Sequence, residues 1–415
     1  MPSFLSDAPA MLTDLKVANR KAVIQVFRSG DVYDANEVSV ITGLSRPTVM
    51  KCIHYFMETG LLISCGKGKS TSTGGKRPEQ FSLADELYYV CLSLWPQETR
   101  VHLYSIRHSL IASKTISSPL SETAAEASRL AASAVQTLLE ENSIQPSSIV
   151  AASVSVPGTV DHETGTLLFS SHKPDWGTHI HLLDDLHALL GAETPLFIEN
   201  AGKMCARPYL TDPDVRTKRV LVLFTTWGLS GCMIERGHIL NGRNALIGEI
   251  GHMIIDPNDP EACGCGSHGC FERLVSRSRV NQMLREAAPH AFPETPLLTI
   301  PEVFAKSAEG DPAVQEMLRR LAGTFARALR NITLVFDPDL VIFQGDYGFA
   351  DSFFESELRR QMGDFRYLPT SHPFEIQFDR RPLETMDAEG SFFALDHLFF
   401  DHLDHYQAEQ QPNRE

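Results

Sequence analysis

Three of the eight cysteines lie in one short glycine-rich segment, Cys263-Gly-Cys265-Gly-Ser-His268-Gly-Cys270, and His252 stands eleven residues before it. Three thiolates and one imidazole form the closed tetrahedral ligand set of structural Zn²⁺. The glycines allow a turn tight enough for all three sulfur atoms to face one ion. In a cytoplasmic chain such clustering favours a metal over disulfides. We therefore predict a structural zinc ion bound by His252, Cys263, Cys265 and Cys270, with His268 as an alternative fourth ligand.

The length and charge of the chain divide it into unlike parts. Its 415 residues, with 37 Lys and Arg against 52 Asp and Glu, predict two or three domains. No apolar run approaches the ~18 residues of a membrane span and no signal peptide is recognisable, so we expect a cytoplasmic protein without a membrane partner. Residues 1–80 contain ten basic and seven acidic side chains, whereas the remainder contains 27 and 45. Only the N-terminal segment is therefore suited to phosphate groups.

The N-terminal segment has the pattern of a helix-turn-helix. Apolar periodicity predicts a first helix over residues 12–27. Either Asp34 or Asn36 can cap a short second helix, which Gly43 ends in a tight turn. Ser45 can then cap a third helix, with a proline in its first turn. This order of elements is typical of a DNA-binding domain whose last helix enters the major groove.

The third helix and the following loop carry the basic side chains. Between Arg46 and Arg77 there are six basic residues and one acidic residue. Two short strands around residues 61–63 and Phe81 predict a hairpin, or wing, with a cationic tip suited to phosphate contacts. We predict that residues 1–82 form a winged helix-turn-helix that binds double-stranded operator DNA as a homodimer or homotetramer. The predicted contacts are Ser45, Arg46, Thr48, Lys51, Lys67, Lys69, Lys76 and Arg77.

The remainder resembles the ROK family of repressors, open reading frames and kinases, which have the actin-like sugar-kinase fold. The motif that carries the resemblance is Gly248-Glu-Ile-Gly-His252 followed by Cys263-x-Cys265-Gly-x-x-Gly-Cys270-x-Glu272, with shorter matches at 156–161, 198–200 and 337–345. Together with the N-terminal segment, the chain looks like the repressor branch. The resemblance implies an α/β protein in which a winged helix-turn-helix is joined to two lobes around a sugar-binding cleft.

The resemblance also implies domain bounds and sugar contacts. The first lobe would span residues 83–200, joined by a C-terminal helix at about 387–403, and the zinc-bearing second lobe would span residues 201–385. Amide, carboxylate and imidazole groups suit sugar hydroxyls. The positions that match the family's sugar contacts are Asn200, Glu249, His252 and Glu272.

One position in the expected cleft departs from the family. Four residues before Trp176 the family commonly has Asn, and this chain has His172. We therefore include His172 among the effector-binding residues. The effector is expected to be an unusual sugar, or a sugar phosphate accommodated by His172 or Lys173, or to be absent.

Three further departures concern the kinase machinery. The position of the family's catalytic Asp is occupied by Ala201, and a methyl group accepts no proton. The first phosphate loop is replaced by Ser-Leu-Trp95-Pro-Gln, and the second contains Trp227 among its glycines. Phosphoryl transfer depends on positioning and charge neutralisation, so we expect no kinase activity and no catalytic residue.

The predicted function is a DNA-binding transcriptional regulator, a repressor in preference to an activator, controlled by a carbohydrate. Two alternatives remain open. One is an active sugar kinase with an added DNA-binding domain, and the other is a regulator controlled by a protein partner, with a vestigial sugar cleft.

Overall fold

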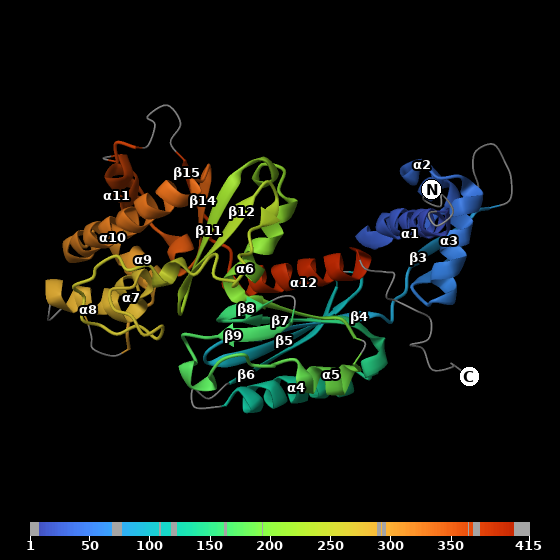
Figure 1. Ribbon diagram of the computed structural model, residues 1–415, viewed down its shortest axis with the longest axis horizontal. Coiled ribbons are helices and arrows are strands. Elements are labelled where there is room, and N and C mark those ends of the chain that lie inside the picture. Colours follow the sequence, from blue (N-terminus) through green and yellow to red (C-terminus); the bar gives the residue numbers. More distant parts are fainter. Residues whose placement is uncertain are drawn as a thin grey trace, which may run out of the picture.

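A computed structural model describes residues 8–68, 77–107, 109–117, 123–161, 164–192, 194–288, 292, 296–363, 365–367 and 374–401. Lys69 and Lys76, two of the predicted DNA contacts, lie outside these residues. Figure 1 shows a small N-terminal domain beside two larger α/β lobes. The described chain forms two five-stranded sheets, one in each lobe, a three-stranded sheet in the N-terminal domain and the small ribbon β8-β9.

The N-terminal domain is a winged helix-turn-helix, as its pattern predicts. Asp34, rather than Asn36, caps the second helix: its carboxylate accepts the backbone N–H groups of Asn36 and Glu37. Gly43 ends that helix in the left-handed conformation, and Ser45 caps the third helix. The elements are α1 (Ala8–Val26), α2 (Ala35–Thr42), α3 (Arg46–Glu58), β1 (Tyr33–Asp34), β2 (Leu62–Lys67) and β3 (Glu79–Leu83), with sheet order β1-β3-β2.

The first lobe is a mixed sheet covered on both faces. All eight residues of β7 are buried, as expected for a central parallel strand between two helical layers. The helices α4 and α5 lie below the sheet in Figure 1, and α12 packs on β4 and β7 from the other side. The sheet order β10-β7-β4-β5-β6 joins β4 (Tyr88–Leu94), β5 (Glu98–Ser105), β6 (Leu110–Ser117), β7 (Ile149–Val156) and β10 (Leu196–Asn200), with α4 (Ala124–Glu141), α5 (Asp184–Leu190) and α12 (Leu383–Asp401).

The second lobe is built around the long helix α10 and a second mixed sheet. Buried aromatic rings from α7, α10, β14 and α11 fill its core. Leu334, in the last turn of α10, is 62 % exposed, because this turn extends beyond the core. The sheet order is β13-β12-β11-β14-β15, from β11 (Arg219–Thr225), β12 (Leu229–Glu235), β13 (His238–Ile239), β14 (Leu340–Gly345) and β15 (Glu375–Phe378).

The remaining elements join and cover these sheets. The α-helices are α6 (Ala201–Ala206), α7 (Phe271–Leu274), α8 (Arg277–Ala287), α9 (Ile300–Ala308), α10 (Pro312–Phe336) and α11 (Ser352–Gly363). The strands are β8 (Thr159–Asp161) and β9 (Thr166–Phe169). The short 3-10 helices are η1 (Phe27–Ser29), η2 (Pro146–Ser148), η3 (Pro174–Trp176), η4 (Arg207–Thr211), η5 (Val215–Thr217), η6 (Ile250–His252) and η7 (Asp346–Phe349). No helix among the described residues is both long and apolar enough to cross a bilayer.

The C-terminal helix α12 links the N-terminal domain to the first lobe. It begins at Leu383, four residues before the predicted start, and runs toward α1 in Figure 1. One hydrophobic core includes Phe27 of η1, Tyr89 of β4 and Phe400 of α12. Arg28 also donates a hydrogen bond from Nε to the Asp396 carboxylate of α12. The winged helix is therefore packed against the body and not merely tethered to it.

The opposite end of α12 reaches the interior of the first lobe. Ser93 of β4 and Ser155 of β7 are register partners in the sheet. Asp387 lies fully buried above them and accepts hydrogen bonds from both hydroxyls, at 2.6 Å from Ser155 Oγ. This burial raises the pKa of Asp387 to about 6.

Candidate functional site

The structure brings His252, Cys263, Cys265 and Cys270 into one cluster, with their ligand atoms within 4.8 Å of one another. Cys263 Sγ lies 3.5 Å from His252 Nδ1, and Cys265 Sγ lies 3.7 Å from Cys270 Sγ. These spacings and this donor set fit a tetrahedrally bound metal ion. The alternative ligand His268 is exposed and lies outside the cluster.

The backbone around the cluster requires glycine at one point. Gly269 has a φ of 68°, and a Cβ there would lie 1.8 Å from the carbonyl oxygen of Asp256. No other residue fits this approach without moving the chain. The tight turn predicted from the glycines is thus a feature of the loop that places Cys270.

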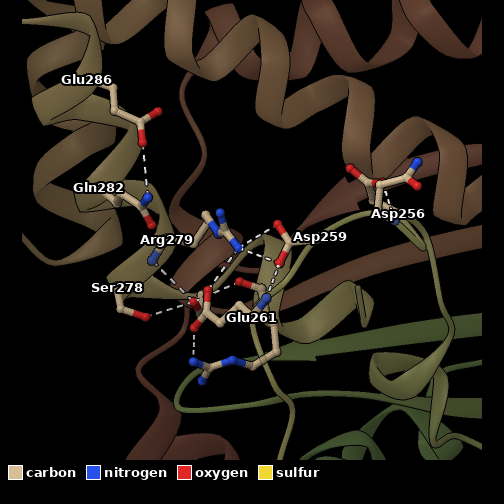
Figure 2. Close-up of polar contacts among 10 residues, drawn as sticks. Asp256, Asp259, Glu261, Ser278, Arg279, Gln282 and Glu286 are labelled. Carbon is tan, nitrogen blue, oxygen red and sulfur yellow. Dashed lines mark hydrogen bonds and ion pairs between the residues drawn. The ribbon is translucent and has the colours of Figure 1, made fainter. Parts of the chain in front are cut away.

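Charged side chains fix the segment that leads into the cluster, as Figure 2 shows. Arg279 of α8 donates to both carboxylate oxygens of Asp259, at 2.7 and 2.6 Å, and pairs with Glu261 at 2.9 Å. Arg273 of α7 also binds Glu261. Hydrogen bonds between an arginine and a carboxylate are stronger than those between neutral groups, so these contacts hold residues 259–261 against two helices just before Cys263. The sequence contains no spacing signal for these pairs, so they could not be predicted from motifs.

The predicted effector residues all line one pocket between the two lobes, which we call the inner pocket. Its wall includes Ala201 at the start of α6 and Thr226 and Gly228 in the β11–β12 loop. The cavity is small, about 50 Å³, compared with about 300–1,000 Å³ for a typical ligand pocket. The predicted effector residues in its lining are His172, Asn200, Glu249, His252 and Glu272.

Asn200 is largely engaged by the protein itself. Its Oδ1 accepts the backbone N–H groups of Gly202 at 2.9 Å and Lys203 at 3.2 Å, and its Nδ2 donates to the Gly158 carbonyl at 2.8 Å. One amide N–H remains for a ligand. Asn200 therefore caps α6 and joins it to the first lobe as well as facing the inner pocket.

The two carboxylates of the inner pocket are each anchored through one oxygen. Thr159 of the first lobe donates to Glu249 Oε1 of the second lobe at 3.0 Å. The backbone N–H of Leu229 donates to Glu272 Oε2 at 2.8 Å. Burial raises the pKa of Glu249. Each carboxylate retains an oxygen able to accept a hydroxyl, which is the chemistry that sugar binding requires.

His252 connects the metal-type cluster to the inner pocket. Its Nδ1 faces Cys263, whereas its Nε2 lies 3.9 Å from Glu249 Oε2. The two ring nitrogens thus face different neighbours, and a metal bound through Nδ1 would fix the orientation of Nε2 toward the pocket.

His172 lies in the inner pocket beside Glu272. Burial lowers the pKa of His172, which favours the neutral ring with one donor and one acceptor nitrogen. A Cβ on Gly228 would lie 2.4 Å from His172 Nε2 and 2.8 Å from Glu272 Oε2. Lys173, the other residue considered for a sugar phosphate, is buried near the Trp176 ring and does not line the pocket.

The two tryptophans that interrupt the phosphate loops meet across the cleft. Trp95 of the first lobe and Trp227 of the second have ring centroids 5.0 Å apart and planes tilted by 56°. The Arg100 guanidinium lies 4.4 Å from the Trp95 ring centroid. Trp95 is buried, whereas Trp227 is 41 % exposed. The sequence showed both residues as departures, but their pairing depends on the relative position of the lobes.

Of the six predicted DNA-contacting residues that the structure describes, five are exposed. Ser45, Arg46 and Lys51 are exposed at the start of α3, whereas Val49 and Ile53 face the core. Thr48 is half-buried, and its hydroxyl lies 2.9 Å from Ser45 Oγ as part of the helix cap. On the wing, Lys67 and Arg77 are exposed.

This architecture defines a class: a winged helix-turn-helix joined to a two-lobed α/β body with a polar interlobe pocket and a Cys/His cluster. The chain belongs to the ROK family, whose family model matches residues 108–380. This match confirms the resemblance and the fold that the sequence motifs predicted.

Two curated relatives are sugar kinases. The chain is 28 % identical over 221 residues to a glucokinase from Thermotoga maritima, a match that covers 51 % of this chain and 68 % of the relative. It is 28 % identical over 211 residues to an N-acetylmannosamine kinase from Escherichia coli O1:K1, covering 51 % and 69 %. The expectation of no kinase activity is therefore wrong, because these relatives point to sugar kinase activity. The replacements at Ala201, Trp95 and Trp227 are not sufficient to exclude that activity.

A solved structure resembles nearly the whole chain. It is a ROK family transcriptional regulator described as a homologue of the E. coli MLC protein, and it superimposes with a TM-score of 0.74 at 16 % identity. The superposition covers 95 % of this chain and 99 % of that one. At this identity the likeness establishes the shared fold, including the N-terminal domain.

Proposed function

We propose that this protein is a transcriptional regulator that binds operator DNA through its winged helix and responds to a sugar in the inner pocket. The observation that carries the proposal is the continuous core from α1 through α12 to the first lobe, which joins the DNA-binding domain to the body. The regulator named above, which shares the fold over 95 % of this chain, supports the same reading.

The DNA-binding part of the proposal rests on exposure and charge. Arg46 and Lys51 would reach base edges or phosphates in the major groove, and the wing with Lys67 and Arg77 would contact the flanking backbone. A single winged helix reads one half-site, so a homodimer on a nearly palindromic operator is proposed. The acidic body would disfavour additional contacts with DNA.

The proposed effector is a neutral sugar, because the inner pocket combines two carboxylates, an amide and two imidazoles. The relatives named above act on glucose and N-acetylmannosamine by their names. The proposed metal is Zn²⁺ at His252, Cys263, Cys265 and Cys270. It would have a structural role, holding His252 and the loop before Glu272 in place.

The response would be a shift between two arrangements of the lobes. At about 50 Å³ the inner pocket is smaller than a typical ligand pocket of about 300–1,000 Å³, so the two lobes would move apart to admit a sugar ring. Binding would therefore favour a more open cleft, in competition with contacts across it such as the Thr159–Glu249 hydrogen bond. Since α12 contacts both the first lobe and the winged helix, that shift would alter operator affinity.

The test begins with an operator selected from random duplexes by the full-length protein. Fluorescence anisotropy then gives its affinity with and without glucose, N-acetylglucosamine and N-acetylmannosamine. Arg46→Ala and Lys51→Ala should each weaken binding by about 1–3 kcal/mol if they contact bases, and Arg129→Ala on α4 serves as a control of equal charge change. Unchanged affinity in both variants would refute the recognition-helix assignment, and no change with any sugar would refute the effector.

The metal is tested separately. His252→Ala should lose bound zinc, measured by elemental analysis, together with the sugar response. His268→Ala should retain both. A metal-free His252→Ala protein with a full sugar response would separate the metal from the effector site.

Sugar phosphorylation is a second candidate function, favoured by the names of the curated relatives. It is tested by sugar-dependent ATP turnover of the full-length protein. Turnover that disappears in Glu249→Gln would establish the activity and place it in the inner pocket.

A further inference from the structure

A second and larger cavity adjoins the inner pocket between the lobes. This outer cavity has a volume of about 500 Å³, ten times that of the inner pocket. The two share Trp95, Thr226 and Trp227 as lining residues, so they meet at the tryptophan pair. The tryptophan pair is therefore the boundary that a ligand occupying both cavities would cross.

The charges of the outer cavity are balanced. Three arginines and three carboxylates line it, and Arg100 pairs with Glu98 and, at 3.0 Å, with Glu384. A polyanionic ligand such as a nucleotide needs an excess of positive charge or a bound cation. Balanced charge favours a ligand that is polar but neutral. The six charged residues are Glu98, Arg100, Arg273, Arg277, Asp346 and Glu384.

Exposed aromatic rings supply the apolar part of the lining. Trp227 is 41 % exposed and Phe349 is 37 % exposed. The polar residues Ser276, Ser278 and Thr299 line the same wall. A sugar ring has this dual character, because its C–H face packs on an aromatic ring while its hydroxyls bond polar groups at the rim.

Trp95, which lines both cavities, has an unused hydrogen-bond donor. Trp95 is 4 % exposed, and its indole Nε1 is buried without a hydrogen-bond partner among the described residues. A buried N–H of this kind is unfavourable unless something accepts it. An oxygen of a ligand that crosses this boundary would do so.

From these observations we infer that the effector is an oligosaccharide of at least two units, with one ring in the inner pocket and the next in the outer cavity against Trp227. The inference rests on the proposed sugar-responsive function and names its ligand class. The tryptophan pair would then select ligand length, since a monosaccharide uses only one side of it.

The experiment compares matched sugars on the full-length protein by isothermal titration calorimetry. Glucose is paired with maltose and cellobiose, and N-acetylglucosamine with its β1,4-linked dimer. In at least one pair the disaccharide should bind ten-fold or more tightly than its monosaccharide. Phe349→Ala and Trp227→Ala should each reduce that ratio at least five-fold. The control is Tyr367→Ala, which removes an aromatic ring that is 81 % exposed outside both cavities and should leave the ratio unchanged.

Each other outcome overturns the inference in a distinguishable way. If monosaccharides bind and no disaccharide binds more tightly, the oligosaccharide is refuted and the sugar-responsive function stands. The oligosaccharide is also refuted if Phe349→Ala changes the ratio of disaccharide to monosaccharide affinity no more than Tyr367→Ala does. If no sugar of either length binds, the sugar part of the proposed function fails as well. Displacement of a bound disaccharide by a non-hydrolysable ATP analogue would identify the outer cavity as a nucleotide site instead.

Discussion

The ion pair between Arg28 and Asp396 provides a test of how firmly the winged helix is joined to the body. Arg28 is on η1 and Asp396 on α12, and their side chains are 26 % and 5 % exposed. Arg28→Met would leave the buried carboxylate without this cation. Breaking a fully buried pair costs about 3–5 kcal/mol, and partial access of water to Arg28 reduces the expected cost to about 2–3 kcal/mol.

The assay is native-state hydrogen exchange of the full-length protein, read at amides of η1 and the second half of α1. A loss of about 2–3 kcal/mol corresponds to exchange about 30- to 150-fold faster. The double variant Arg28→Met/Asp396→Leu, which removes both charges, should recover most of the protection. Lys114→Met breaks an exposed pair with Glu141 and should change stability by less than about 1 kcal/mol. An effect of Arg28→Met no larger than that of this control would show that the ion pair does not hold the winged helix on the body. A double variant as unprotected as the single one would show the same.

Three further predictions concern the body and the wing. Burial raises the pKa of Asp387 to about 6, whereas the pKa of Asp in an unfolded chain is near 4. Between about pH 4 and 6 the folded protein therefore keeps the Asp387 proton that the unfolded chain has lost, so the free energy of unfolding should fall as the pH rises. Urea titrations should show this fall for the wild type and not for Asp387→Asn. Gly228→Ala, whose new methyl meets the imidazole and carboxylate of the inner pocket, should weaken sugar binding at least ten-fold in calorimetry, whereas Gly363→Ala, with open space around it, should not. Lys67→Ala and Arg77→Ala should each lower the slope of log affinity against log salt by about one, and an unchanged slope would remove that residue from the phosphate contacts.

Local signals predicted the winged helix well. Asp34, Gly43 and Ser45 act on the few residues next to them, so their capping roles could be read from the sequence and are confirmed. The His252 and Cys263–Cys270 cluster was also readable, because short spacing and glycines restrict where the ligands can lie.

Contacts between distant segments could not be predicted in the same way. Arg28 and Asp396 are 368 positions apart, and Trp95 and Trp227 belong to different lobes. Neither pair has a periodicity or a motif, since the arrangement of whole lobes brings them together. Asn200 is a different case. Its match to the family motif predicted a sugar contact, but most of its hydrogen-bonding groups bind other parts of the protein.

The length of α12 has a mechanical consequence. With 19 residues the helix is about 28 Å long, from the edge of the outer cavity at Leu383 to the winged helix. Tilting a rigid rod of this length by 5° displaces its far end by about 2.5 Å. In a symmetric dimer both ends would move, so the two recognition helices would change their spacing by up to about 5 Å against a half-site repeat of about 34 Å. A change in the cleft too small to alter the fold would thus be large enough to place one half-site out of register.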